Sequence, residues 1–194
     1  MKKPKVHIIQ KHKEVFNDDE TLLILEQRKQ SSGITDGELQ DFVIFNDGQL
    51  GREWGHIFQL IDTKLAPVLS DYYKQFYQLL PSERISISHI GFLNDHSGSF
   101  TELHYDWEFV KLGEELILKP FVVLIYLSHV EEGGDLLFPL QELTFQPERN
   151  SVLILPCHYS YPHLSMPVTV GHKHICRVTY RIDSKCYEVD ELEI

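Results

Sequence analysis

The hydrophobic period of the chain changes at Pro81. From about Trp54 to Leu80, apolar residues recur every three or four positions, which indicates a helix with one buried face. Pro67 is expected to kink this helix or to split it in two. After Pro81 apolar and polar residues alternate from Ile85 to Ile90, as in a strand with one buried face. The chain is therefore expected to place helices first and a β-rich core second.

Short apolar segments separated by glycine and proline continue to the end of this core. Seven or eight short strands with such punctuation predict an all-β sandwich or barrel. The helices would pack on one outer face of it. The predicted strands cover residues 85–90, 100–106, 121–128, 135–138, 143–146, 151–155, 159–168 and 173–182.

The first fifty residues predict three smaller elements. A short strand is expected at Lys5–Ile9 and another at Phe42–Phe45. A helix is expected from about Asp18 to Lys29, because Asn17 and Glu20 have the spacing of a capping box, in which two side chains satisfy free amides at a helix start.

Length and charge limit the kind of protein. A chain of 194 residues suits one domain, here divided into a helical support region (1–81), a core (82–183) and a C-terminal tail (184–194). The formal net charge of −11 would repel a phosphate backbone, so nucleic acid is not expected as a partner.

The cysteines and the N-terminus indicate the cellular compartment of the protein. Three cysteines without CxxC spacing are expected to be reduced thiols that pack as small hydrophobic residues: Cys157, Cys176 and Cys186. The basic N-terminus is followed by no apolar segment long enough for a signal peptide, and no segment is long enough for a membrane span. The expected location is the cytoplasm.

Three side chains form a candidate metal site. His104 and Asp106 lie two residues apart, so on a strand they would point to the same face. That pair alone is weak evidence. A distant histidine, His163, near the end of the β-rich half would complete a set of two imidazoles and one carboxylate, the facial triad typical of non-haem Fe(II).

A lysine that could bind an anion follows the distal histidine in the sequence. Lys173 lies ten residues after His163, on a strand expected to follow a turn at Gly171. A lysine that points into an apolar interior needs an anion, and the far carboxylate of a dicarboxylic acid would supply one. An exposed turn lysine is the alternative.

Together these motifs resemble the Fe(II)/2-oxoglutarate-dependent dioxygenase superfamily, in particular its prolyl 4-hydroxylase-like branch. The resemblance covers about Ile85 to Ile182. Five landmarks occur in the family's order: His104-Tyr105-Asp106, the strand Phe121–Leu127 with Tyr126, the element Gly133-Gly134-Asp135-Leu136-Leu137-Phe138-Pro139, His163 with Pro167 and Val168, and Lys173.

The resemblance implies a fold and a set of roles. The fold would be α+β and mainly β, a double-stranded β-helix (jelly-roll) barrel with the N-terminal helices on one outer face. His104, Asp106 and His163 would bind Fe(II) as the catalytic centre. Lys173 and Tyr126 would bind the C5 carboxylate of 2-oxoglutarate, with O2 as the oxidant and ascorbate as a candidate reductant.

Several assignments stay open. Arg177 alternates onto the same strand face as Lys173 and competes with it as the anchor of 2-oxoglutarate, with Lys173 preferred. His158 is a weaker alternative to His163. Trp107 and Glu108 follow the HxD motif and are candidates for substrate contact, with plain packing an equal alternative.

The sequence therefore predicts a 2-oxoglutarate-dependent dioxygenase (EC 1.14.11-type) that hydroxylates an aliphatic C–H of a prolyl residue, a free amino acid or a small metabolite and releases succinate and CO2. The partner would be a small-molecule or peptidyl substrate, not nucleic acid or a membrane. A non-catalytic jelly-roll protein that binds metal or a small acid is the alternative. A zinc or manganese enzyme with the same three ligands is a third.

Overall fold

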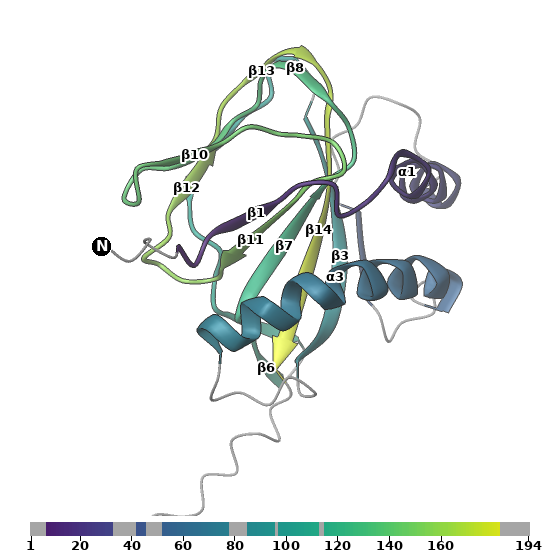
Figure 1. Cartoon of the computed structure of the whole chain (residues 1–194), viewed down its shortest axis with the longest axis vertical. Coiled ribbons are helices and arrows are strands. Elements are labelled where there is room, and N and C mark those ends of the chain that lie inside the picture. Colours follow the sequence, from purple (N-terminus) through teal and green to yellow (C-terminus); the bar gives the residue numbers. More distant parts are fainter. Residues whose placement is uncertain are drawn as a thin grey trace, which may run out of the picture.

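The computed structural model describes residues 7–32, 42–45, 52–77, 85–95, 97–112 and 115–182. Two helices, α1 (Asp18–Ser32) and α3 (Gly55–Phe76), lie on one side of a large sheet. A smaller sheet faces the other side, and α3 crosses the strands of the large sheet (Figure 1). The predicted helices on one outer face of a β-rich core are confirmed.

The large sheet has eight strands and carries most of the core. Its main path runs in the order β1-β11-β7-β14-β3-β2; β6 also pairs with β14, and β5 pairs with β6. Its neighbouring strands are antiparallel. The strands are β1 (Gln10–His12), β2 (Phe42–Phe45), β3 (Ile85–Asp95), β5 (Phe109–Leu112), β6 (Glu115–Leu118), β7 (Phe121–Tyr126), β11 (Val152–Pro156) and β14 (Lys173–Ile182).

The smaller sheet has four strands in the order β10-β9-β12-β4, and β13 pairs with β8 in a separate ribbon. These strands are β4 (Thr101–His104), β8 (Val130–Gly133), β9 (Leu136–Phe138), β10 (Leu143–Phe145), β12 (His163–Ser165) and β13 (Val168–Gly171). Within the described residues no ladder joins the four-stranded sheet to the eight-stranded one. The predicted jelly roll is therefore confirmed, and in the described residues it consists of two facing sheets that do not close into one barrel.

Alternation along β7 divides the core into two layers. Phe121, Val123 and Ile125 pack toward the helices, whereas Val122, Leu124 and Tyr126 point between the two sheets. Strand β11 repeats this pattern, so both faces of the large sheet are buried. The space between the sheets is where a ligand pocket can form.

Helix α1 begins as the sequence predicts. The Asn17 side-chain oxygen accepts from the Glu20 amide at 3.0 Å, and the Asn17 amide donates to the Glu20 carboxylate at 2.9 Å. Glu20 also pairs with Lys64 of α3 at 3.0 Å, so the start of α1 is joined to the second helix.

We expect the Asn17→Ala variant to lose about 1 kcal/mol of unfolding free energy, because the alanine leaves a helix-start amide without its acceptor. Urea unfolding followed by circular dichroism measures this. The Glu20→Gln variant is the control for the charge, since glutamine keeps the reciprocal hydrogen bond. An Asn17→Ala midpoint equal to that of the parent protein would contradict the assignment.

Helix α3 runs unbroken through Pro67. It buries Ile61, Leu65 and Leu69 against the sheet before and after the proline. This burial holds both halves against the sheet even though proline removes a helical hydrogen bond. The alternative of a split helix is therefore wrong.

Several strand boundaries differ from the sequence prediction. The first strand lies at Gln10–His12 rather than Lys5–Ile9, because it pairs with β11; residues 1–6 lie outside the described residues. The predicted strand 159–168 is two shorter strands, β12 and β13, which belong to different sheets. Strands β5, β6 and β8 are additional. The division into support region, core and tail stays a prediction.

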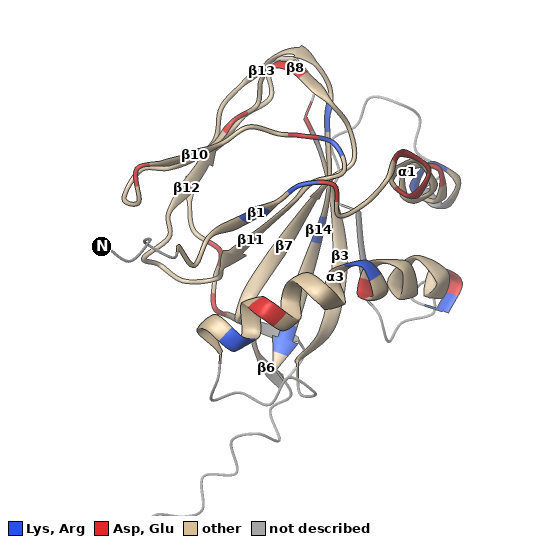
Figure 2. Ribbon diagram, viewed as in Figure 1, with Lys and Arg blue, Asp and Glu red and all other residues tan. Residues whose placement is uncertain are grey.

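Charged side chains are sparse on the central strands but mark β14, as the blue bands in Figure 2 show. Cys157 and Cys176 are free and buried, as expected, and Cys186 lies outside the described residues. Burial raises the pKa of the Cys157 thiol to about 12. No helix in the described part of the chain has the length and apolarity needed to cross a membrane.

Candidate functional site

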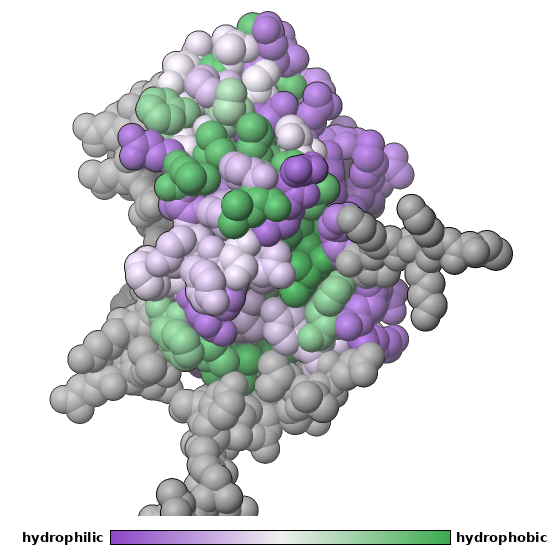
Figure 3. Space-filling view, turned by 90° about the vertical axis from the view of Figure 1, so that its left-hand side faces the viewer, coloured by the Kyte–Doolittle hydropathy of each residue, from purple (hydrophilic) through white to green (hydrophobic). Residues whose placement is uncertain are grey.

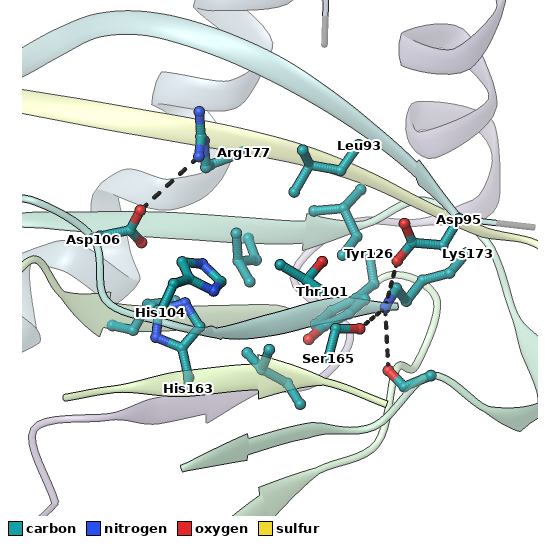
Figure 4. Close-up of a pocket in the computed structure, with 15 residues that line it drawn as sticks. Leu93, Asp95, Thr101, His104, Asp106, Tyr126, His163, Ser165, Lys173 and Arg177 are labelled. Carbon is teal, nitrogen blue, oxygen red and sulfur yellow. Dashed lines mark hydrogen bonds and ion pairs between the residues drawn. The ribbon is translucent and has the colours of Figure 1, made fainter. Parts of the chain in front are cut away.

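A pocket of about 340 Å³ lies between the two sheets, within the usual size range of small-molecule sites. Its walls combine apolar residues from the large sheet with polar residues from both sheets (Figure 4). It is lined by Leu93, Asp95, Thr101, His104, Asp106, Leu124, Tyr126, Gly134, Leu136, Leu155, His163, Ser165, Lys173, Ile175 and Arg177. All six site residues predicted from the sequence are among them.

Two histidines lie side by side at one end of this pocket. His104 of β4 and His163 of β12 are register partners, and their ring centroids are 4.4 Å apart. Nδ1 of His104 lies 2.8 Å from the Glu102 carbonyl oxygen, and Nδ1 of His163 lies 3.0 Å from that of Tyr161. A carbonyl only accepts, so each Nδ1 carries a proton, and in the neutral imidazole each Nε2 then keeps a lone pair for a metal.

Burial favours the neutral form of His163. The side chain is 4% exposed and packs against Phe138, with ring centroids 5.2 Å apart. Desolvation lowers the pKa of His163, although the Tyr161 hydrogen bond and the Asp106 charge oppose this shift. A neutral imidazole is the form that coordinates a cation.

Asp106 lies near the two histidines but beyond the end of its strand. Because β4 ends at His104, the alternation expected from the sequence does not place the Asp106 side chain. Its Oδ1 lies 3.9 Å from a guanidinium nitrogen of Arg177 (Figure 4). Among the described residues no three His, Cys, Asp or Glu side chains form a ready-made metal cluster.

The donor set nevertheless fits a metal of the non-haem iron type. Two imidazoles with free Nε2 atoms and one carboxylate line the same pocket, which is the ligand set of a facial triad. The His104 and His163 rings already lie in contact. The Asp106 carboxylate would have to leave its ion pair with Arg177 to bind the metal.

Lys173 lies at the other end of the pocket and is 3% exposed. Its ammonium group donates to the Asp95 carboxylate at 2.7 Å, to the Gly134 carbonyl oxygen at 3.3 Å and to the Ser165 hydroxyl. The expected lysine in a pocket is confirmed, and the exposed-turn alternative is wrong. The anion that compensates the lysine is Asp95, which the sequence analysis did not consider.

Tyr126 lies beside Lys173 and is 2% exposed. Its ring shares the pocket face with Leu124, as strand alternation predicts. Burial, reinforced by the negative charge of Asp135, raises the pKa of Tyr126 well above its usual value. The hydroxyl therefore keeps its proton and can donate to a bound carboxylate.

Arg177 is the second cation in the pocket and stands on the same face of β14 as Lys173. Its Nε is buried and has no hydrogen-bond partner. The charge of Arg177 also acts on nearby His89. Burial is the main cause that lowers the pKa of His89 to about 4, and the positive charges of Arg177 and Lys119 lower it further. The histidine end of the pocket thus holds a cation with spare donors, and the Lys173 end does not.

Solved structures share this arrangement of sheets and helices. A viral collagen prolyl hydroxylase from Paramecium Bursaria Chlorella virus-1, in complex with 2OG, matches with a TM-score of 0.67 at 14% identity, over 91% of this chain and 97% of that one. A prolyl-4-hydroxylase from Pseudomonas putida matches with a TM-score of 0.61 at 14% identity, over 91% and 94%. The chain has the prolyl 4-hydroxylase fold.

HygX from Streptomyces hygroscopicus, with nickel and 2-oxoglutarate bound, also has this fold, with a TM-score of 0.58 at 12% identity over 91% of this chain and 83% of that one. No protein-family model and no curated protein matches the sequence. The prolyl 4-hydroxylase fold is therefore shared at an identity too low to carry residue roles across.

The competing residues lie elsewhere on this fold. His158 contacts Tyr159 with ring centroids 4.1 Å apart and does not line the pocket. Trp107 is 66% exposed and contacts the Tyr105 ring at a tilt. The face shown in Figure 3 also carries exposed apolar side chains mixed with polar ones.

Sequence reasoning missed the polar residues around Lys173. Asp95 lies directly across from Lys173 in the β14–β3 register, and Ser165 reaches it from the opposite sheet. Neither belongs to a motif. Asp95 lies five residues beyond the predicted strand 85–90, and only the observed length of β3 and its pairing with β14 place it beside Lys173.

Proposed function

We propose that this chain is a non-haem Fe(II)- and 2-oxoglutarate-dependent dioxygenase. The observation that carries the proposal is the paired His104 and His163, each with Nδ1 held by a carbonyl and Nε2 free to bind a metal, in one pocket with Asp106. Histidines that bind a metal usually donate their other ring N–H to a carbonyl in this way.

The iron would be held by His104, Asp106 and His163. When bound, it supplies coordination positions for the 2-oxo acid and O2 and the oxidising chemistry that hydroxylates an aliphatic C–H while 2-oxoglutarate is converted to succinate and CO2.

The protein's own contribution is orientation and exclusion of water. The carbonyls of Glu102 and Tyr161 hold the two imidazoles in place. Tyr126 donates to the C5 carboxylate of 2-oxoglutarate at the Lys173 end, and Arg177 is placed to contact substrate or the C1 carboxylate. The apolar wall keeps this space dry; it consists of Leu93, Leu124, Leu136, Leu155 and Ile175.

The substrate class is part of the same proposal. A prolyl residue, a free amino acid or a small metabolite fits a site of this size that opens between two sheets. The similarity of fold to prolyl hydroxylases supports a prolyl group. A screen of free amino acids and proline-containing peptides separates these classes by the succinate each releases.

We expect succinate to form only when Fe(II), 2-oxoglutarate and O2 are all present, and to stop when a chelator removes the metal. Anaerobically purified protein is loaded with Fe(II), and succinate is measured by chromatography with and without ascorbate. Protein loaded with Zn(II) is the control, because zinc fits the same donors but has no redox chemistry. Succinate formation that is indifferent to iron would disprove the proposal.

A second candidate is a non-catalytic protein that binds metal or a small acid. The ion pair of Asp106 with Arg177 favours it, since that carboxylate is engaged with a cation of the protein. This candidate predicts that 2-oxoglutarate binds and no succinate forms. A zinc or manganese enzyme would instead show that metal on anaerobic purification.

A further inference from the structure

The ammonium group of Lys173 has no donor left for a ligand. A lysine carries three N–H donors. In this pocket they reach the Asp95 carboxylate, the Ser165 hydroxyl and the Gly134 carbonyl oxygen. An incoming carboxylate must therefore displace one of these partners before it contacts the lysine.

The charge of Lys173 is also neutralised. Asp95 Oδ2 lies 2.7 Å from Nζ, and the two side chains are only 15% and 4% exposed, so little water screens the pair. The two residues are direct neighbours in the β14–β3 register, so the backbone of both strands holds them together. This end of the pocket carries one positive and one negative charge.

The Tyr126 hydroxyl can donate to a second carboxylate there, but the ion pair leaves that carboxylate little further attraction. The carboxylate would gain the attraction of Lys173 but suffer the repulsion of Asp95 at nearly the same distance, since both side chains line the pocket. A 2-oxo acid with an uncharged tail suffers neither effect and packs on Leu93, Leu124 and Ile175.

We propose that Asp95 is a specificity-determining residue that competes with the distal carboxylate of the co-substrate for Lys173. The site consequently takes 2-oxo acids with an apolar tail nearly as well as 2-oxoglutarate. This inference rests on the proposed function, because it concerns the co-substrate of the same site.

The test compares two co-substrates of equal chain length. Dissociation constants of 2-oxoglutarate and 2-oxopentanoate are measured by calorimetry on the Mn(II)-loaded protein, so no turnover is required. For the parent protein we expect the two constants to agree within about tenfold, since a free charged hydrogen bond would separate them by roughly tenfold to a hundredfold. A larger preference for the dicarboxylate overturns the inference.

The variant Asp95→Asn keeps the size of the side chain and removes its charge. We expect it to increase the preference for 2-oxoglutarate by about tenfold or more, because the lysine charge is then uncompensated. An unchanged or smaller preference overturns the inference. If the variant does not fold, the preference of the parent protein decides alone.

The control variant is Asp71→Asn, which makes the same change in net charge. Asp71 lies on α3, outside the pocket, and pairs with Lys74 at 3.4 Å on the surface. The Asp71→Asn variant should prefer 2-oxoglutarate over 2-oxopentanoate by the same factor as the parent protein. A preference raised as much as in Asp95→Asn would show a long-range charge effect and overturn the inference.

The two proposals fail in different ways. If neither 2-oxo acid binds the parent protein, the proposed function fails and the inference fails with it. If both bind and 2-oxoglutarate is preferred by more than about tenfold, the function survives and the role of Asp95 does not.

Discussion

Replacement of His163 with alanine is expected to lower succinate formation and metal affinity by about a hundredfold or more. Loss of a residue that only orients a ligand already costs about 10- to 100-fold, so loss of the ligand itself should cost at least as much. His163 is buried and lies against His104, and nothing else in the described part of the pocket places an imidazole at that position.

Metal affinity is measured by calorimetry with Mn(II), and turnover is measured as succinate release with Fe(II). The matched control is His158→Ala, which removes the competing histidine five residues earlier in the chain. His158 receives a hydrogen bond from the Ser160 amide and lies outside the pocket lining. We expect nearly full activity from this control.

The reverse result would identify His158 as the third ligand and would contradict the site described above. Circular dichroism on both variants separates loss of the metal site from loss of the fold. The His163 ring packs on Phe138, so some loss of stability is expected along with the loss of binding.

Replacement of Gly133 with alanine is expected to cost about 4 kcal/mol of unfolding free energy. Its φ of +81° is unfavourable for any residue with a Cβ, which costs about 1–2 kcal/mol. A Cβ at this position would also overlap the backbone oxygen of Pro167, and overpacking of this kind costs about 1–3 kcal/mol.

That oxygen accepts a hydrogen bond from the Gly134 amide at 2.9 Å, and the Gly134 carbonyl in turn accepts from Lys173. Displacement of the Pro167 backbone would therefore disturb the end of the pocket that holds the lysine. For a chain of this length, about 4 kcal/mol corresponds to a decrease in Tm of roughly 10 °C, which differential scanning calorimetry measures.

Gly98→Ala is the control. Gly98 has a similar φ of +89°, but a Cβ there would have no atom within 4 Å. The Gly98→Ala variant should lose only the unfolding free energy that the positive φ costs, about 1–2 kcal/mol. Equal losses in the two variants would show that the contact with Pro167 contributes nothing.

The layers of the fold were predictable because each depends on periodicity. The helical spacing before Pro81 and the alternation after it correctly placed helices on one face of a β-rich core. The capping box at Asn17 was equally predictable, since its residues are three positions apart and need no distant partner.

The sheet boundaries were harder to predict. One continuous segment from 159 to 168 contains β12 and β13, which pair with different strands, and a register shift separates His163 from Ser165. A bulge of this kind changes which face a side chain takes, and a count of alternating residues cannot detect it.

Six residues that line the pocket were predictable from the sequence alone, in an order that predicts a metal and an acid in one pocket: two histidines, an aspartate, a tyrosine, a lysine and an arginine. The pairing of their charges became visible only in the folded chain. Asp95 lies 78 residues before Lys173, and Arg177 lies 71 residues after Asp106, yet each forms an ion pair with its partner. Such pairs depend on strand register and on the approach of two sheets, which long-range packing sets and local sequence does not encode.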